Sequence, residues 1–190
     1  MSKVRLEAFT DAVIAIIMTI LVLELTRPTS DTWSSLKEIF PHLIVYFISF
    51  IILAIYWVNH HHLLQSIQKI DSKVLWINIF FILALSLVPI FSNWVSLYPN
   101  SFIPELSYVL LFSFANLIYL FLTKYLLKIN KEIRRDNATL KKNIVSIVLN
   151  IISITLGYFI APIIMLIGSV IVFSLWIVPD KKVEEILDKN

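Results

Sequence analysis

Two acidic side chains bracket the first apolar stretch of the chain, and their spacing is its most informative chemical feature. Asp11 and Glu24 enclose an uncharged run over residues 12–23. Because a helix needs about 20 residues to cross a bilayer, a spanning helix over residues 5–25 must carry Asp11 close to the hydrocarbon. A carboxylate there is costly and usually faces a partner or a water path. Asp11 is therefore either a proton or ion ligand, or half of a structural ion pair with Arg5 or a neighbouring helix.

Three consecutive histidines, His60–His62, are the second group of side chains that could do chemistry. A metal site is one hypothesis, but consecutive residues of a helix point about 100° apart, so the three imidazoles do not converge on one ion. No HExxH or similar acidic spacing accompanies them, and we expect no metal site here. A hydrogen-bonding role at the inner membrane interface is favoured, without deciding which histidine takes it. The expected polar network ties the first three spans together and contains Asn59, His60, His61 and Trp76, beside Arg5 and Asp11.

Composition indicates a protein that lies almost entirely in a membrane. Of the 190 residues, 58% are hydrophobic and 15% are charged, with a mean hydropathy of +0.84. A soluble domain is nearer a quarter charged. The chain has no cysteine and two glycines, which excludes thiolate metal sites, phosphate-binding glycine loops and a TVGYG-type filter. We expect the lipid bilayer as a partner, no cofactor and no nucleic acid.

Charge-poor blocks predict an all-α fold, one transmembrane domain over residues 1–190 with six spans. The last two spans come from one uncharged run that is too long for a single crossing, and Gly157 and Pro162 mark the turn between them. Five spans is the competing count. Pro89 should bend the third span. The six spans are placed near residues 5–25, 42–64, 74–97, 106–127, 143–159 and 162–178.

Basic residues predict the orientation of these spans. With six spans and both termini cytoplasmic, Arg27 and Lys37 are the only basic residues left outside, as the positive-inside rule requires. The basic stretch over residues 124–142 then reads as a cytoplasmic loop. The basic start and short apolar core of the first segment also resemble a signal peptide. However, its core is flanked by acidic residues and no A-x-A cleavage site follows.

An aliphatic stripe runs along one side of the first helix. Ile16, Ile20 and Leu23 share a face at helical spacing, Thr19 lies at its edge, and Asp11 projects to nearly the opposite side. Such stripes usually face lipid or pack in the core. The alternative is a pore-lining helix, whose copies around an axis would form constrictions that gate by dewetting. Glu24, at the outer end, is either a solvated cap or part of an acidic ring that concentrates cations.

A family resemblance bears on this choice. The first helix starts with Arg5-Leu-Glu-Ala-Phe9-Thr10-Asp11, which resembles the RxxxFSD signature of the transmembrane protein 175 family of potassium channels. The likeness continues through Ile-Met-Thr-Ile-Leu-Val-Leu-Glu-Leu, through Trp-Val-Asn-His-His at residues 57–61, and more loosely over residues 76–89. Thr10 replaces the serine of the signature and keeps its hydroxyl, whereas His62 stands where relatives often carry arginine.

This resemblance implies a six-span subunit of the prokaryotic branch, assembled as a homotetramer around its first helices. It implies constrictions at Ile16, Ile20 and Leu23, a selectivity-related hydroxyl at Thr19, and a structural signature of Arg5, Phe9, Thr10 and Asp11. The expected function is a potassium-preferring cation channel of the cell membrane, not an enzyme. The alternative is a proton-coupled transporter or proton pathway that uses Asp11, Glu24 and the His60–His62 cluster.

Overall fold

The computed structural model describes residues 2–130 and 137–177, with the backbone alone for residues 137–140. The described residues form helices joined by short loops and contain no strand, which confirms the predicted all-α class. The helices are α1 (Lys3–Leu23), α2 (Trp33–Glu38), α3 (Phe40–Gln65), α4 (Ser72–Ser86), α5 (Val88–Leu97), α6 (Phe102–Ile129), α7 (Asn137–Phe159) and α8 (Ile163–Ser174).

Local sequence sets several helix boundaries. The Ser2 hydroxyl accepts the Arg5 N–H at the start of α1, and the Asp71 carboxylate accepts the N–H groups of Lys73 and Val74 at the start of α4. These side chains satisfy donors that the first helical turn leaves unpaired. The predicted bend in the third span is an interruption between α4 and α5, with Pro89 in the first turn of α5. Proline has no N–H to donate and crowds the preceding turn, so a helix breaks there.

Five of the described segments are long and apolar enough to cross a membrane: α1, α3, α4 continued by α5, α6, and residues 141–159 of α7. The chain is thus a multi-pass membrane protein. α8 differs from the predicted sixth span over residues 162–178, because its 12 residues extend only about 18 Å, short of the roughly 30 Å hydrocarbon core.

Trp176 lies just beyond the end of α8 and contacts two other helices. Its indole N–H donates to the Ser146 hydroxyl on α7 (3.0 Å), and its carbonyl accepts the Asn59 amide from α3 (3.1 Å). These bonds tie the turn that follows α8 to α7 and α3. The predicted cytoplasmic C-terminus and residues 131–136 of the basic stretch lie outside the described residues.

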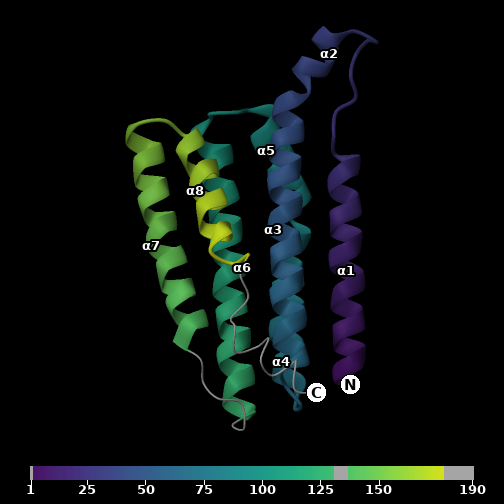
Figure 1. The fold of residues 1–190 in the computed structure, drawn as a ribbon, viewed down its shortest axis with the longest axis vertical. Coiled ribbons are helices and arrows are strands. Elements are labelled where there is room, and N and C mark those ends of the chain that lie inside the picture. Colours follow the sequence, from purple (N-terminus) through teal and green to yellow (C-terminus); the bar gives the residue numbers. More distant parts are fainter. Residues whose placement is uncertain (1, 131–136, 178–190) are drawn as a thin grey trace.

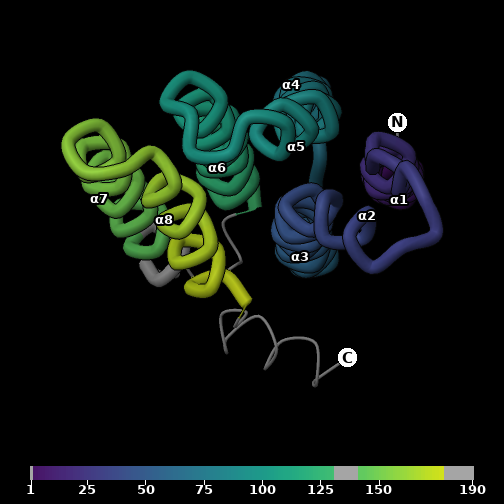
Figure 2. The backbone as a smooth tube through the Cα atoms, turned by 90° about the horizontal axis from the view of Figure 1, so that it is seen from above, coloured from purple at the N-terminus to yellow at the C-terminus, as the bar shows by residue number. Residues whose placement is uncertain are grey.

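α1 lies at one edge of the molecule. It packs against α3, α4 and α5, while α6, α7 and α8 lie on the far side of α3 and α5. Seen from above, α1 and α7 occupy opposite ends of the arrangement (Figure 2). α1 and α3 run antiparallel, so the start of α1 lies beside the end of α3 (Figure 1). The core between these edges is rich in aromatic rings, among them Tyr56, Phe81, Tyr108, Phe112 and Phe173.

Candidate site on the first helix

The predicted aliphatic stripe is the exposed face of α1. Ile16, Ile20 and Leu23 are 56%, 40% and 79% exposed. The opposite side of the same helix packs against the bundle through Leu6, Ile14, Ile17 and Leu21, each at most 3% exposed. Within one chain, the stripe is therefore a surface without a protein neighbour among the described residues.

Thr19 presents an oxygen to this surface. Its hydroxyl donates to the Ile16 carbonyl of the preceding turn (2.7 Å), and the side chain is exposed. Since a hydroxyl has one proton and two lone pairs, a donor already engaged by its own helix leaves the lone pairs to face outward. The group available at the stripe is thus an acceptor, the type of atom that replaces water around a cation.

The opposite face of α1 is fastened to α3 at successive turns. Lys3 Nζ donates to the Gln65 and Ile67 carbonyls (3.2 and 2.8 Å). One turn further along, Glu7 pairs with His61 Nδ1 (3.0 Å). After another turn, Trp57 Nε1 donates to Asp11 Oδ1 (2.9 Å). Each contact steps four residues along both antiparallel helices, so the ladder fixes their register.

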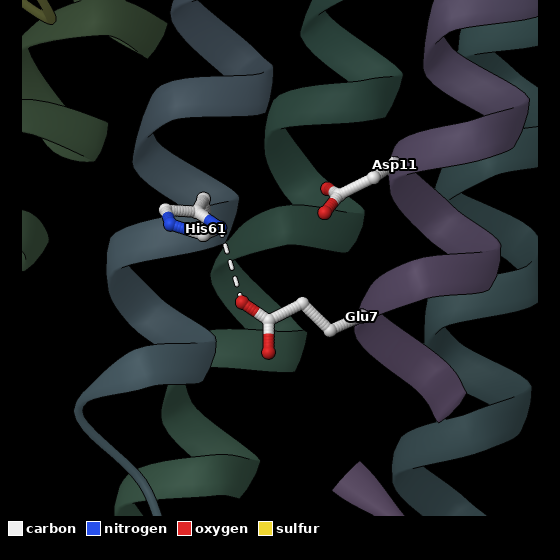
Figure 3. Close-up of side chains that lie close together, drawn as sticks. All are labelled: Glu7, Asp11 and His61. Atoms are coloured by element: carbon white, nitrogen blue, oxygen red, sulfur yellow. Dashed lines mark ion pairs between the residues drawn. The ribbon is translucent and has the colours of Figure 1, made fainter. Parts of the chain in front are cut away.

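Figure 3 shows the carboxylates of Glu7 and Asp11 leaving α1 on the side that faces His61. Asp11 was expected to be either a proton or ion ligand or a structural partner of Arg5 or a neighbouring helix. In the structure it contacts a neighbouring helix, where it accepts the Trp57 N–H. Trp57 and Glu7 were not among the predicted site residues. Their four-residue spacing from His61 and Asp11 is the sequence signal that could have found them.

A buried chain of hydrogen bonds joins three helices just beside this ladder. His60 Nε2 donates to Asn78 Oδ1 (2.8 Å), and Asn78 Nδ2 donates to the Thr10 hydroxyl oxygen (2.7 Å). The Thr10 hydroxyl in turn donates to the Leu6 carbonyl (2.9 Å). His60, Asn78 and Thr10 are all 0% exposed. His60 is therefore the histidine that ties α3 to α4 and α1.

The other predicted network residues lie elsewhere. Asn59 joins α3 to the end of α8 through the Trp176 carbonyl, and the buried Nδ1 of His62 has no hydrogen-bond partner among the described residues. Trp76 is 63% exposed and takes no part in the network formed by the described part of the chain. Arg5 and Phe9 are also exposed, on the side of α1 that carries the stripe.

Glu24 ends α1 at the opposite end of the helix. Its Oε2 accepts the Asn93 amide of α5 (3.0 Å). Next to this pair lies a cavity of about 10 Å³ whose lining includes Ser92 and His42, enough for about one water molecule. His42 Nδ1 lies 2.7 Å from the Ser96 hydroxyl. Asp11 and Glu24 thus belong to separate polar clusters at the two ends of the stripe.

Comparison with known proteins identifies relatives of this chain. Residues 5–89 match the family model of the endosomal/lysosomal potassium channel TMEM175. A potassium channel from Chryseobacterium sp. is 50% identical over 95 residues, which make up 50% of each chain. A potassium channel from Streptomyces collinus is 33% identical over 45% of this chain and 43% of its own. The endosomal/lysosomal proton channel TMEM175 of Danio rerio is 28% identical over 53% of this chain and 20% of its own.

The chain spans about half the length, or less, of these curated relatives. One solved structure covers much more of it. This is a lysosomal potassium-selective channel TMEM175 homolog from Chamaesiphon minutus, with a TM-score of 0.80, 23% identity, and coverage of 92% of this chain and 95% of the other. The whole described bundle therefore has the fold of that homolog. The match to the TMEM175 family model covers residues 5–89, the part of the chain from α1 to the start of α5 that carries the ladder and the stripe.

Proposed function

We propose that several copies of this chain form a potassium-preferring cation channel of the cell membrane, whose pore is lined by the exposed face of α1. The observation that carries the proposal is the contrast between the two sides of α1. One side is fastened to α3 and α4, and the other leaves Ile16, Ile20 and Leu23 uncovered. The names of the bacterial relatives support potassium as the ion. An ion channel of this kind has no catalytic residues and needs no cofactor.

The spacing of the stripe suits a narrow apolar gate. Its three residues lie about 6 Å and then about 4.5 Å apart along the helix axis, so symmetric copies would stack three aliphatic rings within about 10 Å. Apolar rings of this kind stop ions by excluding water. The Thr19 hydroxyl oxygen lies between the levels of Ile16 and Ile20 and offers the acceptor that a partly dehydrated potassium ion requires.

The remaining residues of the motif have supporting roles in this proposal. Thr10 and Asp11 hold α1 in place within one subunit. Arg5 and Phe9 are exposed on the stripe side, where a neighbouring copy would meet them. A ring of Glu24 carboxylates at the outer mouth would raise the local concentration of cations. We propose four copies and cytoplasmic termini, as the family resemblance implies.

Potassium flux into liposomes that contain the purified protein tests the pore assignment. Ile16→Asn should change the flux, because an amide wets the constriction. Ile151→Asn on α7 is the matched control, since Ile151 is 59% exposed at the opposite edge of the molecule. Equal flux for the wild type and the Ile16 variant, in protein of unchanged assembly, would remove α1 from the permeation path.

Proton conduction is the second candidate, because the vertebrate relatives are named proton channels. Asp11, Glu24 and His60 would be the groups that exchange protons. The structure favours this candidate less, since Asp11 and Glu24 are 13 residues apart, about 20 Å along α1, and hydrogen-bond different helices. A pH-sensitive dye inside the liposomes distinguishes the two. A proton flux that Asp11→Asn abolishes, while assembly and potassium flux persist, would establish the second function.

A further inference from the structure

The side of α1 that faces away from the stripe carries a compact set of metal-binding side chains. Glu7, Asp11 and His61 each offer one ligand atom, and these atoms all lie within 4.8 Å of one another. Figure 3 shows the two carboxylates and the imidazole converging on the space between α1 and α3. The side chain of His61 is 31% exposed and that of Glu7 is 18% exposed, so the cluster is shielded yet reachable.

His61 supplies an independent reason to expect a ligand. Its Nδ1 is inaccessible to solvent and makes no hydrogen bond of acceptable geometry with the described residues, although Glu7 Oε1 lies 3.0 Å away. A buried ring nitrogen without a directed hydrogen bond is uncommon. In this position Nδ1 faces two carboxylates, an arrangement in which a cation can take the place of the ring proton.

The surrounding side chains suit the outer shell of such a site. Trp57 Nε1 donates to Asp11 Oδ1 and orients that carboxylate, which leaves Oδ2 free to bind. The Gln65 amide lies 2.7 Å from His61 Nε2. Its nitrogen donates to the Nε2 lone pair, so that Nδ1 carries the ring proton and faces Glu7. When a metal ion binds Nδ1, the ring proton moves to Nε2, and the Gln65 amide, turned so that its oxygen faces the ring, accepts it, as outer-shell partners of metal-bound histidines do.

The donor set selects the class of metal. One imidazole and two carboxylates suit zinc and similar divalent transition ions, whereas magnesium and calcium prefer oxygen ligands alone. Three protein ligands leave a fourth position for water. With metal–ligand bonds of about 2.0–2.2 Å, tetrahedral ligands lie about 3.4 Å apart. Side-chain rotations that draw the most distant ligand atoms together by up to about 1.4 Å would therefore close the site.

We propose that Glu7, Asp11 and His61 bind a divalent transition metal ion, such as Zn²⁺, that bridges α1 and α3. The ion takes the place of the His61 Nδ1 proton that faces Glu7, the proton moves to Nε2, and three metal–ligand bonds replace one contact of the ladder. This site is distinct from the stripe of Ile16, Ile20 and Leu23, because it lies on the opposite, packed face of α1. The proposal does not depend on ion conduction.

Calorimetric titration of Zn²⁺ into the purified full chain in detergent tests the proposal. The protein is prepared with a histidine-free affinity tag and treated with a chelator. We expect one bound ion per chain and no comparable binding of Mg²⁺. Glu7→Gln, Asp11→Asn and His61→Gln should each weaken binding by more than the roughly 10–100-fold that loss of an outer-shell partner costs. Asp11→Asn keeps an oxygen that accepts the Trp57 N–H, which protects the fold.

Two controls separate a ligand role from a structural one. His62→Gln, next to His61 and also with a buried ring nitrogen that lacks a partner, should bind Zn²⁺ like the wild type. Co²⁺ in place of Zn²⁺ should give visible d–d absorption bands that the three ligand variants lose while their helix content is unchanged. Absence of stoichiometric Zn²⁺ binding, or equal affinity in the wild type and all three variants, would show an ordinary ion pair and overturn the proposal.

Discussion

Replacing Asn78 by leucine tests whether the buried chain His60–Asn78–Thr10 holds α1 in place. Leucine matches asparagine in shape but can neither accept the His60 N–H nor donate to Thr10. All three side chains are 0% exposed, so no water replaces the lost partner. The Thr10 hydroxyl keeps its bond to the Leu6 carbonyl, which leaves His60 as the group that is orphaned.

The expected magnitude follows from these contacts. A buried donor left without a partner costs about 1–3 kcal/mol. Losing a neutral hydrogen bond between membrane helices costs about 0.6 kcal/mol on average. We therefore expect Asn78→Leu to lower the free energy of unfolding by about 2 kcal/mol, roughly a 30-fold change in the folding equilibrium. Reversible unfolding in mixed micelles, followed by far-ultraviolet circular dichroism, measures this change.

A double variant provides the control. The His60 ring stacks on Phe81 at 5.6 Å with an interplanar angle of 8°, and phenylalanine at residue 60 keeps that stacking without the N–H. Replacing both partners of a buried hydrogen bond by apolar groups of similar shape is nearly neutral. His60→Phe combined with Asn78→Leu should therefore be more stable than Asn78→Leu alone. A double variant as unstable as the sum of its single variants would refute the reasoning.

Two further predictions concern other contacts of the described helices. Gly168→Ala should lower the free energy of unfolding by about 1–3 kcal/mol, because the added methyl group would overlap the Ser153 hydroxyl where α7 packs on α8. Gly157→Ala meets a flexible methionine side chain and should lower it by less in the same unfolding assay. Equal losses of stability in the two variants would contradict this reasoning. The hydrogen bond from the Tyr125 hydroxyl, with those from the first turn of α4, lowers the pKa of Asp71 below its ordinary value. Because the folded-state pKa is the lower one, the stabilisation is fully present above the ordinary carboxyl pKa and is lost as the pH falls through the lowered value. Asp71→Asn keeps the helix cap and should flatten the acid limb of a stability–pH profile; a limb of unchanged slope would show that Asp71 does not contribute.

The features that depend on one helix were readable from the sequence. The separation of Asp11 from Ile16 and Leu23 follows from the helical period, and Pro89 marked the interruption between α4 and α5. The same period also shows why Trp76 stands apart from the network. It precedes Asn78 by two residues, which places the two side chains about 200° apart, so a buried Asn78 turns Trp76 toward the outside.

The contacts between helices were not readable, because they depend on how far one helix slides along another. The partner of Asp11 was expected to be Arg5 or a neighbouring helix, and the register of α1 against α3 is what selects Trp57 for Asp11 and His61 for Glu7. The contacts of Trp176 beyond α8 likewise join helices that are distant in the sequence. The Trp176 indole donates to Ser146 on another helix, a contact that the apolar character of this segment does not predict.

Thiol labelling tests the central claim that the exposed face of α1 lines the permeation path. The chain contains no cysteine, so single variants can be made without further changes. In liposomes, a small charged thiol reagent added to Leu23→Cys or Thr19→Cys should block potassium flux. The same treatment of Ile151→Cys on α7 should leave it unchanged. Full labelling of Leu23→Cys and Thr19→Cys, verified by mass spectrometry, with undiminished flux would contradict the account.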